Sequence, residues 1–402
     1  MRNRNKGYRR LKILGAVFLG LFLLFLCIPV PRFDDPYSTV LTAKGGELLG
    51  ARIAADGQWR FPASNQYSDK YFACLLEYED QQFFRHIGFN PVAFVEAIVE
   101  NAKAGEVVRG GSTISMQVVR LARKNKPRTY REKLLEVILA VRLELHYSKR
   151  SILNLYAAHA PFGGNVVGLD AAAWRYFHTT PDRLTWSEAA TLAVLPNAPS
   201  MIHPGRSRER LLEKRDALLL RMTSSSLYAP RRWHLPVLSR DDYELALMER
   251  LPDKPYEMPM TAYHYMMDQE RRHKGEQIRS TLEEPMQRAV MEIMSRHYQT
   301  NVLNQIENAA VYVVNYLSGE VVCYVGNNLE AKDAAMVDMV KAQRSTGSIL
   351  KPFLFAAMLD EGSLLPTMLL PDIPMSLTGF TPRTIRDNTG GRCPPTRPCS
   401  SR

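Results

Sequence analysis

The stretch EYEDQQFFRHIGF, residues 77–89, brings acidic, aromatic and imidazole side chains close together. If it is helical, Glu79, Phe83 and His86 fall at positions i, i+4 and i+7, which share one face. A carboxylate, an aromatic ring and an imidazole on one face could line the wall of a catalytic cleft. The same pattern fits a half-buried helix with a solvated acidic edge. The stretch alone leaves both interpretations open.

A glycine-rich turn, RGGSTISMQ at residues 109–117, is a second candidate. Gly110 and Gly111 let the backbone approach a ligand closely, and Ser112 and Thr113 are suited to capping a following helix. The amides exposed at such a helix start attract phosphate. Because the segment lacks the Gly-Lys-Ser/Thr of a nucleotide-binding loop, it indicates an anion site of another kind.

The segment REKLLEVILAVRLELHYS, residues 131–148, has the period of an amphipathic helix. Its predicted buried stripe contains Leu134, Ile138, Val141 and Leu145. The opposite line contains Lys133, Glu136, Ala140 and Glu144. That polar line is either a solvated face with helix ion pairs or a lysine and carboxylates offered to a site.

A third candidate is RSTGSILKPF at residues 344–353. Ser348 and Lys351 are one helical turn apart, so a neutral lysine could take the serine proton for attack on an acyl carbon. Chance supplies many Ser-x-x-Lys sequences, so this pattern is weak on its own.

The elements that must position these residues follow an apolar N-terminal segment. The chain has 402 residues and a formal net charge of +11, and no aromatic-plus-basic motif for nucleic acid is present. Residues 13–30 carry no charge, which predicts a transmembrane signal-anchor after a cytoplasmic basic tail at 1–12. A cleaved signal peptide is the alternative. Six basic residues make up the tail's charge: Arg2, Arg4, Lys6, Arg9, Arg10 and Lys12.

The amino-acid composition divides the rest of the chain, residues 31–402, into five regions. Residues 31–66 read as a membrane-proximal connection and residues 67–225 as a helical domain. Residues 226–278 are rich in proline and charge, which indicates a linker or irregular insert. Residues 279–385 combine a helix with a hairpin at Ser318-Gly319, and residues 386–402 read as a disordered tail. The expected fold class is thus mainly α, followed by a smaller α/β part.

The order of motifs over residues 40–225 resembles the peptidoglycan glycosyltransferase domain of class A penicillin-binding proteins. The motif E-D-x-x-F-x-x-H-x-G is complete as Glu79, Asp80, Phe83, His86 and Gly88. The motif G-G-S-T-I-x-x-Q is complete as Gly110 to Ile114 with Gln117. The third keeps Lys133 and Glu136 but has Glu132 where arginine is usual, and the fourth has Ala157 and Ala158 in place of Leu-Asn. The fifth matches through Glu188, Ala189, Leu192, Leu195, Pro196 and Pro199.

The resemblance implies a lysozyme-like helical fold that polymerises lipid II in the bacterial inner membrane, with the catalytic domains outside the cytoplasm. Glu79 and Glu136 would be catalytic, and Glu136 is also a candidate ligand for Mg²⁺ or another divalent cation; no organic cofactor is implied. Lipid II, the nascent strand, membrane lipids and cell wall synthesis proteins are the expected partners. The implied substrate-binding residues are Asp80, Phe83, His86, Gly111, Ser112, Thr113, Gln117 and Lys133.

Ser348 and Lys351 resemble the start of a penicillin-binding transpeptidase domain, and both would be catalytic there. The later S-x-N and K-T-G or K-S-G motifs do not follow Lys351 in this chain. We therefore expect an incomplete α/β transpeptidase domain without transpeptidase activity. A lysozyme-like glycan hydrolase and an inactive membrane-anchored scaffold are the alternatives, although the GGST loop and Lys133 favour departure of a diphosphate over attack by water.

Overall fold

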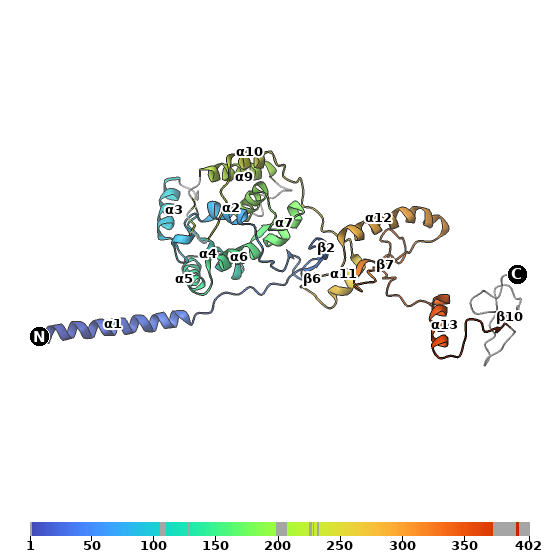
Figure 1. Cartoon of the computed structure of the whole chain (residues 1–402). Coiled ribbons are helices and arrows are strands. Elements are labelled where there is room, and N and C mark those ends of the chain that lie inside the picture. Colours follow the sequence, from blue (N-terminus) through green and yellow to red (C-terminus); the bar gives the residue numbers. More distant parts are fainter. Residues whose placement is uncertain are drawn as a thin grey trace. The chain divides into compact units, whose positions relative to one another are not determined.

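The computed structural model describes residues 2–104, 110–127, 129–197, 207–224, 227, 229–230, 233–372 and 391–393 (Figure 1). The described chain is mainly helical. It divides into two compact units, Met1–Val340 and Lys341–Arg402. The candidate residues of the helical domain all lie in the first unit.

The N-terminal helix α1 (Arg2–Leu26) ends at Leu26, before the end of the apolar segment predicted at residues 13–30. Pro29 and Pro31 follow it, and proline both lacks an N–H and disfavours helical geometry in the preceding residue. Within the part of the chain that the structure describes, no helix has the length and hydropathy needed to cross a membrane. The predicted span is therefore not confirmed.

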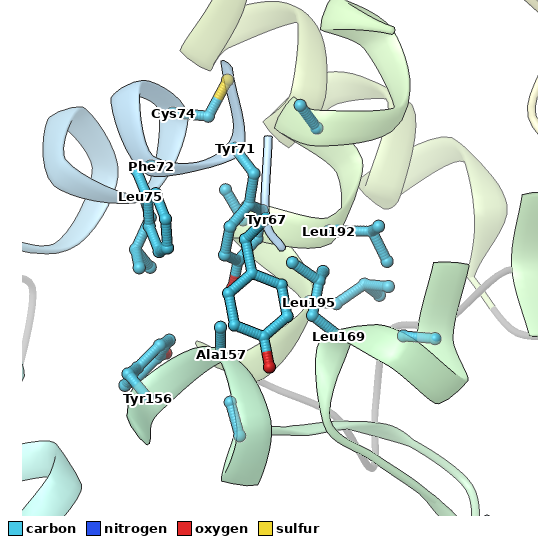
Figure 2. Packing of buried hydrophobic residues seen from close by; sticks show 14 of the residues in the cluster. Tyr67, Tyr71, Phe72, Cys74, Leu75, Tyr156, Ala157, Leu169, Leu192 and Leu195 are labelled. Carbon is cyan, nitrogen blue, oxygen red and sulfur yellow. The ribbon is translucent and has the colours of Figure 1, made fainter. Parts of the chain in front are cut away.

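The helical domain is assembled around two groups of helices. Helix α2 packs on α8 and α9, and α4 packs on α5 and α6. Figure 2 shows Tyr71 and Phe72 of α2 in one apolar cluster with Tyr156 of α6 and Leu192 of α8. The helices are α2 (Asp69–Glu79), α3 (Pro91–Ala104), α4 (Ile114–Ala122), α5 (Tyr130–His146), α6 (Lys149–His159), α7 (Leu169–Phe177), α8 (Trp186–Val194) and α9 (Arg208–Thr223), with 3₁₀ turns η1 (Phe83–Arg85) and η2 (Leu195–Asn197).

Helix α5 turns a different face inward from the predicted one. Leu134 is 63% and Leu145 48% exposed, whereas Glu136, Leu139, Ala140 and Leu143 are buried. The predicted buried stripe was wrong at Leu134 and Leu145, and of the two interpretations of the polar line the solvated face does not hold at Glu136 and Ala140. The reason is that Glu136 and Glu144 both pair with cations from neighbouring helices, so the carboxylates can be buried.

Two three-stranded sheets flank the helices. One has the order β3–β5–β4, and the other the order β2–β1–β6, in which β6 runs parallel to β1. The region predicted as an irregular insert, 226–278, therefore contains α10, α11 and part of a strand that pairs with the N-terminal connection. The elements are β1 (Thr39–Thr42), β2 (Leu48–Arg52), β3 (Trp59–Arg60), β4 (Pro161–Gly163), β5 (Val166–Val167), α10 (Arg240–Met248), α11 (Tyr263–Glu270) and β6 (Gln277–Arg279).

The hairpin predicted at Ser318-Gly319 is confirmed, because β7 and β8 pair in antiparallel register across it. Gly319 has φ +72°, which suits a glycine in the turn. These elements are α12 (Glu284–Asn301), η3 (Val302–Asn304), β7 (Val311–Val314) and β8 (Val321–Val325).

The second unit contains η4 (Gly347–Leu350), α13 (Lys351–Asp360), β9 (Leu370–Asp372) and β10 (Gly391–Cys393). Strands β9 and β10 pair in antiparallel register. Residues 391–393 thus form a strand inside the predicted disordered tail, and the rest of 386–402 lies outside the described residues.

Candidate active site

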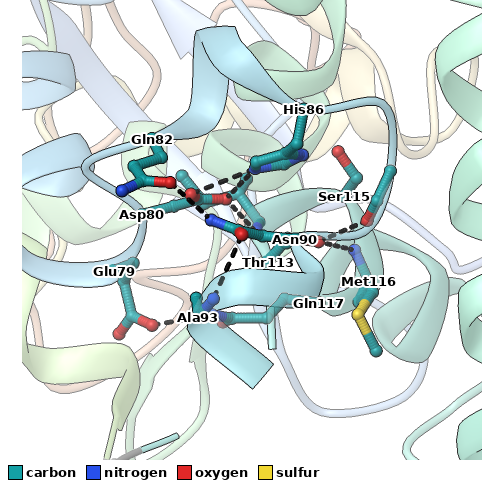
Figure 3. A network of polar contacts seen from close by, with 12 residues as sticks. Glu79, Asp80, Gln82, His86, Asn90, Ala93, Thr113, Ser115, Met116 and Gln117 are labelled. Carbon is teal, nitrogen blue, oxygen red and sulfur yellow. Dashed lines mark hydrogen bonds and ion pairs between the residues drawn. The ribbon is translucent and has the colours of Figure 1, made fainter. Parts of the chain in front are cut away.

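Glu79 is the last residue of α2, which positions its carboxyl at the C-terminal end of that helix. The Gln117 side-chain amide of α4 donates a 2.6 Å hydrogen bond to Glu79 Oε2 (Figure 3). Burial raises the pKa of Glu79; the Asp80 charge adds to this rise, while Gln117 and Lys214 oppose it. A half-buried carboxylate with a raised pKa and a single amide donor suits a general base.

The helix ends at Glu79, so the expected common helical face with Phe83 and His86 does not form. Asp80 leaves the helical region with φ −161°, and the next helical residues are the 3₁₀ turn η1. Phe83 is fully buried and the His86 side chain is 5% exposed. The sequence interpretation of a shared surface was wrong here because Asp80 turns inward to bond with other elements.

Asp80 joins the loop to the start of α4. Its Oδ2 accepts a 3.1 Å hydrogen bond from the Ile114 backbone N–H, and His86 Nε2 lies 3.1 Å from both carboxylate oxygens (Figure 3). A carboxylate at a helix N-terminus also stabilises the helix dipole. Asp80 therefore acts here as a structural tie, and its oxygens are occupied by protein groups.

Thr113 and Gly88 make a second tie between the same two segments. Thr113 caps α4 by accepting from Met116 N–H at 3.2 Å, and its hydroxyl donates a 2.6 Å hydrogen bond to the Gly88 carbonyl. Gly88 has φ +72°, and a Cβ there would lie 2.4 Å from the backbone nitrogen of Val141 in α5. Only glycine fits this position, and the Thr113 hydroxyl, expected to bind substrate, is already engaged.

A cationic cluster lies next to the glycine-rich turn. Lys133 Nζ donates a 2.6 Å hydrogen bond to Ser112 Oγ, and Arg120 reaches the same oxygen at 3.4 Å. Arg120 also binds both oxygens of Glu136, at 2.8 and 2.9 Å. Glu136 is 5% exposed at its side chain, and Lys133 lies 3.9 Å from it. The buried carboxylate therefore holds the two cations in place.

Sequence reasoning missed Arg120. It lies three residues after Gln117, so the two share a face of α4. That spacing is visible in RGGSTISMQVVR and could have identified it. Helix α4 thus presents Gln117 to Glu79. Three residues and about 4.5 Å further along the helix axis, it presents Arg120 to Ser112 and Glu136.

The surroundings of Glu136 do not fit a divalent cation. Both of its oxygens accept from Arg120, and the Lys133 ammonium is adjacent. A metal ion prefers a site with several free oxygen ligands and no guanidinium beside them. Among the described residues, no group of three or more His, Cys, Asp or Glu side chains is placed to hold a metal.

Comparison with known proteins agrees with the motif order. Residues 47–223 match the family model described as Transglycosylase. This part of the chain is therefore similar to the transglycosylase family. The chain is 35% identical to penicillin-binding protein 1C of Escherichia coli (strain K12) over 371 residues, which is 90% of this chain and 46% of that relative. The transglycosylase domain and this relative confirm the resemblance to class A penicillin-binding proteins.

Other relatives match different shares of the chain. Penicillin-binding protein 1A of Aquifex aeolicus (strain VF5) is 31% identical over 56% of this chain and 32% of its own length. A crystal structure of penicillin-binding protein 1A from Haemophilus influenzae aligns over 90% of this chain and 59% of its own, at 15% identity and a TM-score of 0.33. The chain spans less than half the length of the two curated relatives.

Glu132, Ala157 and Ala158, which depart from the family motifs, are ion-paired or buried in the structure. Glu132, which stands where arginine is usual, binds the Arg123 guanidinium at 2.6 and 3.1 Å, so its charge is neutralised locally. Ala157 and Ala158 are buried in α6. Gly168 approaches so closely that a Cβ there would lie 2.5 Å from the Ala158 carbonyl oxygen.

Ser348 and Lys351 lie outside the transglycosylase domain, in η4 and at the start of α13. Both residues are exposed, and no hydrogen bond joins their side chains in the described structure. Ser348 and Lys351 therefore do not form the hydrogen-bonded pair that proton transfer from the serine hydroxyl requires.

We therefore expect labelled penicillin to leave Ser348 unmodified. The purified chain would be incubated with the labelled drug, and covalent adducts counted by mass spectrometry, with Ser348→Ala as the background. Stoichiometric labelling of Ser348 in the parent chain would contradict this expectation.

Proposed function

We propose that this chain polymerises lipid II into glycan strands, with Glu79 as the general base and the Arg120–Lys133 cluster as the site of the departing diphosphate. The observation that carries the proposal is that one helix contacts both groups: α4 bonds Glu79 of α2 through Gln117 and contributes Arg120 to the cationic cluster, where it binds Glu136. The match to the transglycosylase family supports the same reaction.

In this mechanism the acceptor sugar presents its 4-hydroxyl to Glu79. The carboxylate removes the proton as the oxygen attacks C1 of the donor sugar, which is linked to undecaprenyl diphosphate. The attack inverts the anomeric centre, so no covalent glycosyl-enzyme is required. Positioned general-base catalysis of this kind contributes about 10²–10⁴-fold in rate.

The departing diphosphate would accumulate negative charge beside Lys133, Arg120 and Ser112. Pre-positioned cations stabilise such charge because they need little reorganisation during the reaction. Glu136 would act by orienting Arg120 and Lys133.

We place this reaction at the outer surface of the bacterial inner membrane, with the basic N-terminus in the cytoplasm. The exposed apolar side chains of α1, among them Phe18 at 73% and Leu24 at 68%, support membrane attachment. Phe89 and Phe94 pack together with ring centroids 5.6 Å apart. Other candidates for contact with lipid are the exposed apolar side chains of α3 and α5, which are Val92, Val95, Val99, Leu134 and Leu145.

The direct test of this function offers the purified chain two substrates. With labelled lipid II, we expect a ladder of growing glycan on a gel. With preformed uncrosslinked glycan, we expect no shortening. Chain cleavage would instead assign a hydrolase, and the absence of both products would assign a non-catalytic scaffold.

The raised pKa of Glu79 predicts the acidic side of the pH–rate profile. A general base acts only when ionised, so kcat/KM falls as pH is lowered through the pKa of Glu79, and this fall lies above the ordinary value of 4.5. Gln117 lowers that pKa through its hydrogen bond. Gln117→Leu should therefore move the acidic limb to higher pH, measured as initial rates of polymerisation. A limb that stays in place would exclude Glu79 as the titrating group.

A further inference from the structure

A buried ion pair that the proposed mechanism does not use lies against the loop of residues 80–88. Lys149, the first residue of α6, places Nζ 2.7 Å from Glu144 Oε2 of α5. The two side chains are 18% and 4% exposed. A pair so far removed from water must satisfy its charges through specific protein contacts.

The Lys149 ammonium also contacts the loop of residues 80–88. It donates a 2.8 Å hydrogen bond to the His86 backbone carbonyl and lies 4.1 Å from the centre of the Phe83 ring. One cation thus contacts a carboxylate, a carbonyl and an aromatic face. Burial lowers the pKa of Lys149, and the bond to Glu144 opposes this fall.

Glu144 extends the network to α4. Its Oε1 accepts a 2.5 Å hydrogen bond from Ser115 Oγ and lies 4.0 Å from His86 Nδ1. The other His86 nitrogen, Nε2, is held by Asp80. Besides the ties from Asp80 to Ile114 and from Gly88 to Thr113, the Lys149–Glu144 pair therefore fastens the loop to α4 a third time, through Ser115.

We propose that Lys149 and Glu144 are positioning residues that fix the loop of residues 80–88 and thereby hold Glu79 at its place beside Gln117. Glu79 is bonded directly to Asp80, so a shift of this loop moves the base. Loss of Lys149 would leave Glu144 buried without its cation and release the His86 carbonyl. The effect on rate rests on the proposed function, whereas the effect on the loop does not.

The test compares Lys149→Met, Lys149→Arg and the parent chain by hydrogen exchange and by polymerisation kinetics. For Lys149→Met we expect faster amide exchange in residues 80–90, unchanged exchange in α12, and a fall in kcat of about 10²-fold, with KM within about twofold. Lys149→Arg keeps the charge and should restore most of the rate. Arg240→Met, which removes a cation from an exposed pair with Glu244, is the matched control and should equal the parent.

A double variant, Glu144→Gln with Lys149→Met, covers the case in which Lys149→Met does not fold. It removes both charges, so no buried carboxylate is left without a partner. Exchange in residues 80–90 should still be faster than in the parent chain. Parent-like exchange there, in a folded variant lacking Lys149, would overturn the proposal. If the parent chain does not polymerise lipid II, the proposed function fails, and the exchange comparison still decides the role of the pair.

Discussion

Replacing Glu79 by glutamine is expected to lower the rate of lipid II polymerisation by about 10²–10⁴-fold. Glutamine has nearly the same shape and can still bond with Gln117, but it cannot accept the hydroxyl proton. The measurement is the initial rate of polymer formation at saturating lipid II. Glu244→Gln, which alters an exposed carboxylate on α10, should retain the parent rate.

Glu79→Gln should not lower the stability of the folded chain. Because the folded state raises the pKa of Glu79, the ionised carboxylate opposes folding at pH values above that pKa, and the opposition disappears below the unfolded value. At pH 7 the Glu79→Gln variant should therefore unfold at the parent's temperature or higher. A variant that polymerises as fast as the parent would show that Glu79 is not the base. A variant that unfolds at a lower temperature would contradict the inferred cost of burying this carboxylate.

Replacing Arg120 by methionine is expected to have the second largest effect. We expect a fall in polymerisation of about 10²–10³-fold, since a cation beside the departing diphosphate is lost. The substitution also leaves Glu136 buried without its bidentate partner, which should lower the free energy of unfolding by about 3 kcal/mol. Initial rates and urea unfolding measure the two effects separately.

Two variants separate catalysis from folding at this position. Arg120→Met with Glu136→Gln removes both charges, so stability should return towards the parent value while the rate stays low. Arg123→Met removes the partner of Glu132, at the edge of the cluster, and should change the rate far less. Recovery of the rate in the double variant would contradict a role for Arg120 at the diphosphate.

The local parts of the fold were readable from the sequence. Asn90 and Pro91 are residue types typical of a helix start, and in the structure Asn90 Oδ1 accepts from Ala93 N–H at 3.1 Å while α3 begins at Pro91. Thr113 caps α4 as its residue type indicated. These features depend on interactions within a few residues, which the sequence displays directly.

The parts that depend on distant contacts were not readable. Helix α5 buries Glu136 and Glu144 because Arg120 and Lys149 come from other helices, and hydrophobic periodicity carries no information on such partners. Strand β6 pairs with β1 across more than two hundred residues. The motif containing Glu79 was found by resemblance, but its division into one proposed base and several structural ties required the positions of Ile114, His86 and Gly88.

In the proposed reaction the sugar hydroxyl, and not water, displaces the diphosphate. The most direct measurement is the ratio of undecaprenyl diphosphate released to glycosidic bonds formed, with purified chain and labelled lipid II. We predict one diphosphate for each new bond. Diphosphate release without polymer growth would contradict this claim.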